Sequence, residues 1–404
     1  MLTLEKFEQA TDIVKKVTNP TKLVYSDYLS RQTGGKVYLK PENMQQTGSY
    51  KLRGAYYKIS TLSKEEREKG LVAASAGNHA QGVAYAAKAF GCKATIVMPS
   101  ITPLIKVNRT KSYGAEVILY GDGYDDAYEK AVELAKERDC TFIHPFDDLD
   151  VAIGQGTITM EIIQELPTVD YILAPVGGGG LITGVAALAK MLNPKIQVIG
   201  VEPIEAASMS ASLEAGHVVT LESTNTIADG TAVKTVGENT FTYAKQYVDQ
   251  MLTVEDDELI GVFLDMVENH KMVVENSGLL TIAALKQLDL EGKKVVSILS
   301  GGNMDVITMS SIVQHGLIQR DRIFSVSVLL PDKPGELVRV ADTIAKAQGN
   351  VIKLEHNQFV STNRNAAVEL RITMESFGTE HKREILKALE DNGYKPKSIS
   401  AKLY

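Results

Sequence analysis

The sequence lacks tryptophan and has only two cysteines among its 404 residues. Cys92 and Cys140 lie far apart in the sequence and do not form a CxxC pair. We interpret both as reduced packing residues, because a cytosol keeps isolated thiols reduced. The cysteine content therefore predicts a cytoplasmic protein.

Long apolar runs and an excess of basic residues are also missing. No apolar stretch is long enough to cross a bilayer, and charged residues interrupt the first residues, Met1–Lys6, where a signal peptide would be apolar. The net charge of −7 argues against a general binder of nucleic acid or of anionic membranes, since both need a basic face. A chain of 404 residues is long enough for two or three domains with sizeable cores.

The stretch around Lys51 predicts a reactive amine. Thr47, Gly48 and Ser49 are residues of loops and helix N-caps, so we expect a helix to begin at about Tyr50. Lys51 then lies in the first helical turn, where the positive end of the helix dipole disfavours an ammonium group. Partial burial would lower its pKa further and leave an amine able to form a Schiff base. Most lysines are solvated surface residues, so this interpretation depends on the rest of the chain.

One pattern occurs three times: a continuous apolar strand that runs into a turn with glycine. The strands are expected at 71–74, 171–174 and 295–299, and the turns are Ser75–His79, Gly177–Gly180 and Ser300–Asn303. Continuous apolar strands separated by helices are typical of parallel sheets that are covered on both faces. Ligands of such sheets bind beyond the carboxyl ends of the strands. The pattern therefore predicts one cleft lined by all three turns.

The four consecutive glycines, Gly177–Gly180, predict a phosphate site. They stand between a strand and a helix, where backbone N–H groups and the helix dipole favour an anion. The stretch is not a Walker A motif and does not have GxGxxG spacing. The alternative is that the glycines only allow tight packing of helix on strand.

The other two turns have a plainer alternative, since Ser and Asn commonly cap helices. Beside a phosphate site, the N–H groups of Ser75–His79 would hold a carboxylate, and Asn78 would hydrogen-bond a cofactor oxygen. We interpret His79 as a residue of the first helical turn rather than a general base. Ser300 would meet a ring nitrogen, whereas Glu275 is as readily a solvated carboxylate at a helix end. A phosphate cradle, a buried amine and a hydroxyl for a ring nitrogen together suggest pyridoxal phosphate.

Near residue 320 the pattern changes to that of a small βαββαβ domain. Strands are expected at 324–330, 351–356, 367–372 and near 398, with helices at 336–348 and 380–392. This order predicts a ferredoxin-like sandwich. We therefore divide the chain into residues 1–320, with a subdomain at about 50–150 inserted within them, and residues 324–404.

Four ordered motifs resemble the fold-type II pyridoxal-phosphate enzymes, specifically the threonine/serine dehydratase family. They are Thr47–Ala55, Ser75–Gly82, Pro175–Leu181 and Ser300–Asn303, and the likeness covers about residues 5–320. The resemblance implies an α/β catalytic region, similar to tryptophan synthase β, with two open twisted sheets. It implies that Lys51 carries the cofactor, that the glycines hold its phosphate, and that Asn78 and Ser300 contact the ring hydroxyl oxygen and the pyridine nitrogen. The implied cofactor-binding residues are Tyr50, Lys51, Asn78, Gly177, Gly178, Gly179, Gly180, Leu181, Glu275 and Ser300, and the implied substrate-binding residues are Ser75, Ala76, Gly77 and His79.

The C-terminal part resembles an ACT domain, an amino-acid-sensing module. The stretch Leu330–Leu337 is similar to the first strand–helix turn of that domain. The resemblance implies an amino-acid or nucleotide effector bound through Gly335, Glu336, Asn350 and Val351. It also implies a homodimer or homotetramer.

The implied activity is dehydration and deamination of L-threonine, and also of L-serine, to 2-oxobutanoate or pyruvate and ammonia. Racemases of this family have a serine as second base where this chain has Ala76, and alanine cannot transfer a proton. Tyr50 replaces the usual phenylalanine, and Ser208 stands where some relatives have an aspartate that binds a divalent cation, so we expect no tight metal site. The alternatives are a serine dehydratase, a racemase, a β-replacement synthase, or a binding protein that has lost its chemistry.

Overall fold

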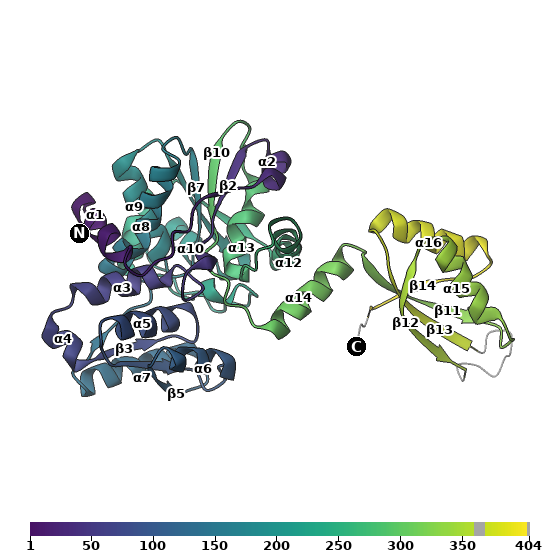
Figure 1. Ribbon diagram of the computed structural model, residues 1–404, viewed down its shortest axis with the longest axis horizontal. Helices are drawn as coiled ribbons and strands as arrows, with labels where there is room; N and C mark the ends of the chain where they lie inside the picture. Colours follow the sequence, from purple (N-terminus) through teal and green to yellow (C-terminus); the bar gives the residue numbers. More distant parts are fainter. Residues whose placement is uncertain (359–367, 402–404) are drawn as a thin grey trace. The chain divides into compact units, whose positions relative to one another are not determined.

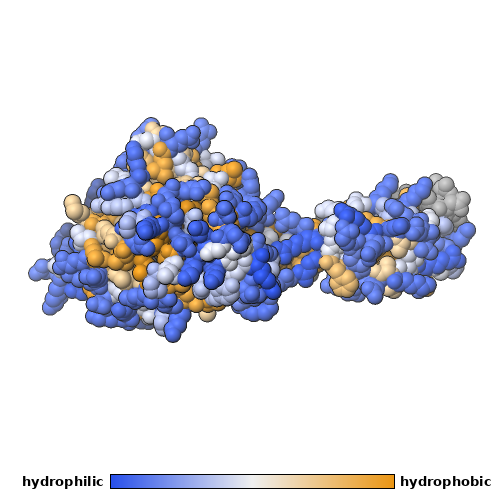
Figure 2. Space-filling model, turned by 90° about the horizontal axis from the view of Figure 1, so that it is seen from above, coloured by the Kyte–Doolittle hydropathy of each residue, from blue (hydrophilic) through white to orange (hydrophobic). Residues whose placement is uncertain are grey.

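A computed structural model describes residues 1–358 and 368–401 (Figure 1). The chain divides into two compact units, Met1–Asp305 and Val306–Tyr404. The division falls at the start of helix α14 (Val306–Gln319), whereas the sequence placed a border near residue 320, at the end of that helix. No helix within the described ranges is long and apolar enough to span a membrane. On the face seen in Figure 2, each unit has a largely hydrophilic surface with apolar areas between the polar side chains.

The larger sheet of the first unit has six strands in the order β1-β2-β10-β7-β8-β9. Its strands are β1 (Val24–Tyr25), β2 (Lys36–Lys40), β10 (Lys294–Ile298), β7 (Tyr171–Pro175), β8 (Gln197–Pro203) and β9 (Gln250–Val254). All neighbours are parallel except β1, which pairs antiparallel with β2. The strand that comes last in sequence, β10, thus lies between β2 and β7 in the middle of the sheet.

The smaller sheet is wholly parallel, in the order β5-β4-β3-β6. Its strands are β3 (Leu71–Ala74), β4 (Ala94–Met98), β5 (Glu116–Leu119) and β6 (Thr141–Phe142). Alternate residues of β3 and β4 enter two different cores, one with α5 (Asn78–Ala89) and one with α7 (Tyr124–Glu137). The sheet is therefore covered on both faces, as the continuous apolar strands predicted. The prediction of an α/β fold with two open sheets is confirmed.

The remaining helices of the first unit cover the two sheets or connect them (Figure 1). They are α1 (Leu4–Val14), α2 (Asp27–Thr33), α3 (Lys51–Thr61), α4 (Lys64–Lys69), α6 (Leu104–Ser112), α8 (Leu149–Glu165), α9 (Gly180–Leu192), α10 (Ser208–Ala215), α11 (Glu238–Tyr247), α12 (Asp256–Asp265) and α13 (Asn276–Ala283). Strand β9 lies among the helices of residues 230–287. This strand is at the edge of the sheet and only two of its five residues are buried, so its apolar pattern is weak.

The second unit contains an antiparallel sheet with the order β12-β13-β11-β14. Its elements follow the chain as β11 (Ile323–Leu330), α15 (Glu336–Lys346), β12 (Asn350–Asn357), β13 (Val368–Glu375), α16 (Thr379–Asp391) and β14 (Lys397–Ile399). The predicted βαββαβ order is confirmed. Residue 367, where the third strand was expected to begin, lies outside the described residues. The apolar residues of β11 and β13 pack against α15 and α16 in a core of their own.

Candidate active site

The turns that follow the strands meet beside the loop that leads into α3. Ser49 forms an antiparallel bridge with Gly301. The backbone N–H of Tyr50 donates to the carbonyl of Ser300 at 3.0 Å, and the N–H of Gly302 donates to the carbonyl of Gly48 at 2.9 Å. These bonds place Lys51 directly beside the carboxyl end of β10, at the sheet edge where ligands of parallel sheets bind.

Lys51 is the first residue of α3, and its amine points at a backbone carbonyl. Nζ donates to the carbonyl oxygen of Pro145 at 2.8 Å. Burial lowers the pKa of Lys51 to about 8, although the negative charge of Glu275 acts in the opposite direction. The amine is therefore a base of the strength that neutral to mildly alkaline solution requires.

Helix α3 begins at Lys51, in agreement with the predicted start at about Tyr50 and with Lys51 in the first turn. Tyr50 occupies the cap position without a side-chain hydrogen bond, and Ser49 is fully buried in its bridge with Gly301. Lys51 Nζ lies 5.5 Å from the centre of the Tyr50 ring. Burial, with the charge of Glu275 added, raises the pKa of the Tyr50 hydroxyl, which therefore stays neutral.

The glycine loop, Gly177–Gly180, has no side chains of its own, so its backbone lines the site directly. It runs from the end of β7 into α9, and Gly179 has a φ of 95° that favours glycine. A Cβ added at Gly178 would lie 2.2 Å from the ring of Phe146, and one added at Gly180 would lie 3.0 Å from the backbone of Phe146. The loop thus presents backbone N–H groups at the N-terminus of a 13-residue helix, where an anion is favoured. Leu181, predicted to bind the cofactor, packs its side chain into the core beneath this loop.

A chain of amide and carboxylate hydrogen bonds connects the other predicted residues. Asn78 Nδ2 donates to Glu275 Oε1 at 2.6 Å, and Asn303 Nδ2 donates to Asn78 Oδ1 at 2.7 Å. Asn303 also donates from Nδ2 to the carbonyl of Thr47 at 2.8 Å and from its backbone N–H to Glu275 Oε2 at 3.2 Å. The Asn78 amide is thereby oriented, and one hydrogen of its Nδ2 remains available to a ligand. The motif Ser300–Asn303 contained Asn303, but the sequence gave no role to its side chain.

Glu275 is buried rather than solvated, so the plainer interpretation of this residue is wrong. Its side chain lies at the N-terminus of α13 and accepts the hydrogen bonds of Asn78 and Asn303. Burial, helped by the charge of Asp229, raises its pKa to about 7. Glu275 is therefore only partly ionised near neutral pH, and its charged form raises the pKa values of both Tyr50 and Lys51.

The turn Ser75–His79 leads from β3 into α5 and leaves space for a ligand. Ser75 Oγ accepts from the N–H of Gly77 at 3.1 Å, and Ala76 is half-buried beside it. A Cβ added at Gly77 would meet no atom of the described chain within 4 Å. His79 is buried, and its Nε2 donates to the carbonyl of Ile143 at 2.9 Å. Burial and the nearby Lys51 lower the pKa of His79 to about 3, which agrees with its interpretation as a helix residue rather than a base.

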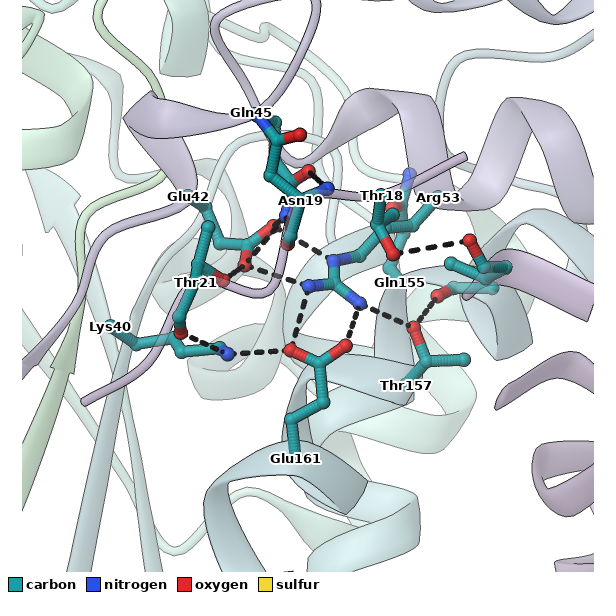
Figure 3. A network of polar contacts seen from close by, with 12 residues as sticks. Thr18, Asn19, Thr21, Lys40, Glu42, Gln45, Arg53, Gln155, Thr157 and Glu161 are labelled. Atoms are coloured by element: carbon teal, nitrogen blue, oxygen red, sulfur yellow. Dashed lines mark hydrogen bonds and ion pairs between the residues drawn. The ribbon is translucent and has the colours of Figure 1, made fainter. Parts of the chain in front are cut away.

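Behind Lys51, a buried ion network fixes α3 (Figure 3). The Arg53 guanidinium donates to Glu42 at 2.8 and 2.9 Å and to Glu161 at 2.7 and 2.9 Å. Lys40 Nζ donates to the Glu161 carboxylate at 2.5 Å. Gly54, next in α3, lies so close to α8 that an added Cβ would be 2.7 Å from the carbonyl of Val151. This network was not predicted from the sequence, in which its signal is the presence of charged residues within otherwise buried elements.

Two further predictions concern residues outside this site: the absence of a tight metal site near Ser208, and the effector site of the second unit. Ser208 begins α10, and the first turn of this helix binds Glu202 of β8, which accepts from Ser210 Oγ at 2.6 Å and from the N–H of Met209 at 2.7 Å. No group of three acidic, histidine or cysteine ligands occurs among the described residues, and the absence of a tight metal site stays a prediction. In the second unit, Gly335 and Glu336 begin α15 whereas Asn350 and Val351 follow its end, about 16 Å away along an 11-residue helix. One chain does not bring these four residues together.

The chain is similar to characterised proteins over nearly its whole length. Residues 14–301 match the family described as pyridoxal-phosphate dependent enzyme. The chain is 44% identical to an L-threonine ammonia-lyase of Thermotoga maritima over 99% of its own length and 100% of the relative, and 42% identical to one of Geobacter sulfurreducens over 98% of both. Among solved structures, threonine deaminase isoform 2 from Solanum lycopersicum has a TM-score of 0.74 at 40% identity, covering 78% of this chain and 94% of that one. Serine racemase from Dictyostelium discoideum has a TM-score of 0.71 at 36% identity, covering 76% and 99%.

Proposed function

This chain belongs to the family of pyridoxal-phosphate dependent enzymes and, within it, to the threonine ammonia-lyases, and from this membership we propose that it converts L-threonine to 2-oxobutanoate and ammonia. It is a lyase, and its cofactor is pyridoxal phosphate. The observation that carries the proposal is the partly buried Lys51 amine, with its lowered pKa, at the edge of the sheet. L-Serine is proposed as a second substrate.

The residues of the site fit this cofactor. The glycine cradle suits a phosphate group, since its N–H groups stand at a helix N-terminus. The clashes that a Cβ would make there are with Phe146 and other protein atoms, so they explain the glycines by close packing of the loop. We assign the phosphate to Gly177–Gly180 and the covalent attachment to Lys51. Asn78 has one hydrogen of Nδ2 for the ring hydroxyl oxygen, because Glu275 takes the other. Ser300 offers the ring nitrogen a neutral hydroxyl rather than a carboxylate.

Lys51 also acts as the base. When bound, pyridoxal phosphate supplies an electron sink that stabilises negative charge on the α-carbon of an amino acid. The freed Lys51 amine takes the α-proton, for which a pKa of about 8 suits neutral solution. The Pro145 carbonyl accepts one N–H of the amine and so fixes where the nitrogen stands.

The turn Ser75–His79 holds the substrate carboxylate in this proposal. The space on the Cβ side of Gly77 is open, and the turn leads into the 12-residue helix α5, whose N-terminus favours an anion. Ala76 has no proton to give, so the α-carbon cannot be reprotonated from a side chain at that position. This favours elimination over racemisation.

Replacing Lys51 with alanine tests the assignment. Lys51→Ala should have no measurable threonine turnover in a steady-state assay of 2-oxobutanoate, while Lys64→Ala, which alters an exposed lysine of α4, should match the unchanged protein. Normal turnover by Lys51→Ala would contradict the proposal. Comparing threonine with serine, with and without an added thiol, separates the ammonia-lyase from a serine dehydratase and from a β-replacement synthase.

We further propose that the second unit senses an amino acid or nucleotide and shifts an equilibrium of the catalytic unit. Its βαββαβ fold and its fusion to a catalytic unit support this. Titration with isoleucine, valine, serine and a nucleotide should change the activity of the full chain, and deletion of 325–404 should remove the response but keep catalysis. A response that survives the deletion would show that the effector binds elsewhere. We also propose a homodimer or homotetramer in the cytoplasm.

A further inference from the structure

His144 has a hydrogen-bonding arrangement that defines its protonation state. Its Nδ1 accepts two backbone N–H groups, from Phe146 at 3.2 Å and from Asp147 at 2.8 Å. A backbone N–H only donates, so Nδ1 cannot carry a hydrogen. The ring is therefore neutral with its hydrogen on Nε2. Burial agrees with this, because it lowers the pKa of His144 to about 4.

The turn that His144 closes, residues 144–147, contacts the reactive lysine at one of its residues. Pro145, the second residue, is buried, and its carbonyl oxygen is the acceptor for Lys51 Nζ. A backbone carbonyl can be aimed only by the turn to which it belongs. The two N–H bonds to His144 Nδ1 fold the backbone on both sides of Pro145 and so determine where this carbonyl points.

The same turn contacts the glycine loop at its other residues. The ring of Phe146 fills the space where Gly178 has no Cβ. Asp147 Oδ1 accepts from the N–H of Thr240 at 3.2 Å, and Thr240 Oγ1 donates to the carbonyl of Gly178 at 2.7 Å. One four-residue turn thus lies between the amine and the proposed phosphate cradle.

Aromatic neighbours hold the His144 ring in place. Its centre lies 4.8 Å from that of Phe146, 5.9 Å from that of Tyr128 and 6.0 Å from that of Phe142, all in edge-to-face geometry. Packing alone would therefore explain an aromatic or apolar residue here. It does not explain a ring nitrogen aimed at two backbone N–H groups.

We propose that His144 is a positioning residue whose Nδ1 sets the turn 144–147, and through it the distance and direction between the Lys51 amine and the glycine loop. The inference rests on the role proposed for Lys51, and it adds that the acceptor atom, not the aromatic ring, is what the site requires. His144 itself does not contact the reacting atoms.

Two variants separate the acceptor from the ring. His144→Asn keeps an oxygen acceptor, because Oδ1 branches from Cγ as Nδ1 does, whereas His144→Leu keeps apolar volume without any acceptor. In the holoenzyme we expect His144→Leu to lower kcat for threonine by about tenfold to a hundredfold, the loss typical of a misplacement near 1 Å. The value of kcat/KM should fall equally, as for an interaction needed in the transition state. His144→Asn should stay close to the unchanged protein.

A spectroscopic measurement reports positioning independently of turnover. The visible circular dichroism of the bound cofactor depends on how the protein orients it, and it should change in His144→Leu and return in His144→Asn. Equal damage in both variants, or an unchanged spectrum and kcat in His144→Leu, would overturn the inference.

The protonation of the two His144 ring nitrogens can be measured in the unaltered protein, so this test does not depend on whether a variant folds. Nitrogen-15 NMR of histidine-labelled holoenzyme should show His144 neutral with its hydrogen on Nε2 at neutral pH, and the His144→Asn sample identifies its signal. A protonated ring or a hydrogen on Nδ1 would overturn the inference. Absence of threonine turnover in the unaltered protein would instead contradict the proposed function, while the NMR and dichroism results would still decide the role of His144.

Discussion

Replacing Arg53 with methionine should strongly destabilise the catalytic unit. The Arg53 and Glu42 side chains are 0% exposed and Glu161 is 17% exposed. Water can therefore hardly solvate the carboxylates once the guanidinium is removed. Among the described residues, Glu42 would keep hydrogen bonds from two neutral donors, Thr21 at 2.6 Å and Gln45 at 3.2 Å, and the more distant charge of Lys40. Breaking a buried ion pair from one side costs about 3–5 kcal/mol, because the remaining charge stays buried. We expect a loss of free energy of this size in the region of α3 and α8.

Hydrogen exchange measured by mass spectrometry on peptides of α3 and α8 tests this prediction. It reports the opening free energy of that region alone, which is useful in a chain of two units. The expected loss corresponds to exchange that is faster by about a hundredfold to a few thousandfold. Protein and cofactor concentrations must be equal in all samples, since ligand binding alone changes stability.

Arg31→Met is the matched control for this experiment. Arg31 pairs with Asp27 at 3.0 Å, but the two side chains are 74% and 69% exposed. An exposed pair contributes about 0–1 kcal/mol. Adding Glu42→Gln to Arg53→Met should recover part of the loss, with an interaction energy of about 0.5–3 kcal/mol. If Arg53→Met exchanges no faster than Arg31→Met, the reasoning from buried charge is refuted.

Three further predictions concern the site. The kcat for threonine should rise with pH through about 8, because Lys51 acts as a base only after its amine loses a proton; a flat profile from pH 6 to 9 would contradict this. Gly178→Ala should weaken cofactor binding in a fluorescence titration by about tenfold or more, since its Cβ must displace a phenylalanine ring 2.2 Å away. Gly123→Ala, with open space at its Cβ, should bind normally, and equal affinities in the two variants would refute the argument. Asn303→Ala should also weaken cofactor binding, because it frees the amide of Asn78; an unchanged affinity would show that Glu275 alone orients that amide.

The parts of the molecule that the sequence predicted are those with a local signal. The apolar runs at 71–74 and 171–174 lead into their turns within a few residues, and parallel pairing brings such turns to one sheet edge. The ferredoxin-like unit could also be predicted from the sequence. Apolar and polar residues alternate in β11, and α15 and α16 are amphipathic helices that follow it along the chain.

The parts that the sequence did not predict depend on residues distant in the chain. Asn303 is 225 residues from its partner Asn78, and Arg53 is 108 residues from Glu161. His144 had no periodicity or motif around it, and its ring nitrogen accepts two N–H groups that only the folded turn brings to it.

The place of β10 in the larger sheet has a consequence for synthesis on the ribosome. This strand is the last of its sheet to be translated, yet it lies between β2 and β7, and the turn after it carries the bonds that anchor the lysine loop. A nascent chain that ends before residue 294 has an open gap in its sheet, and one that ends before residue 300 also lacks the turn that anchors the lysine loop. Coenzyme capture must therefore wait until nearly the whole catalytic unit has left the exit tunnel, and until then the unpaired edges of β2 and β7 are exposed to chaperones and to aggregation.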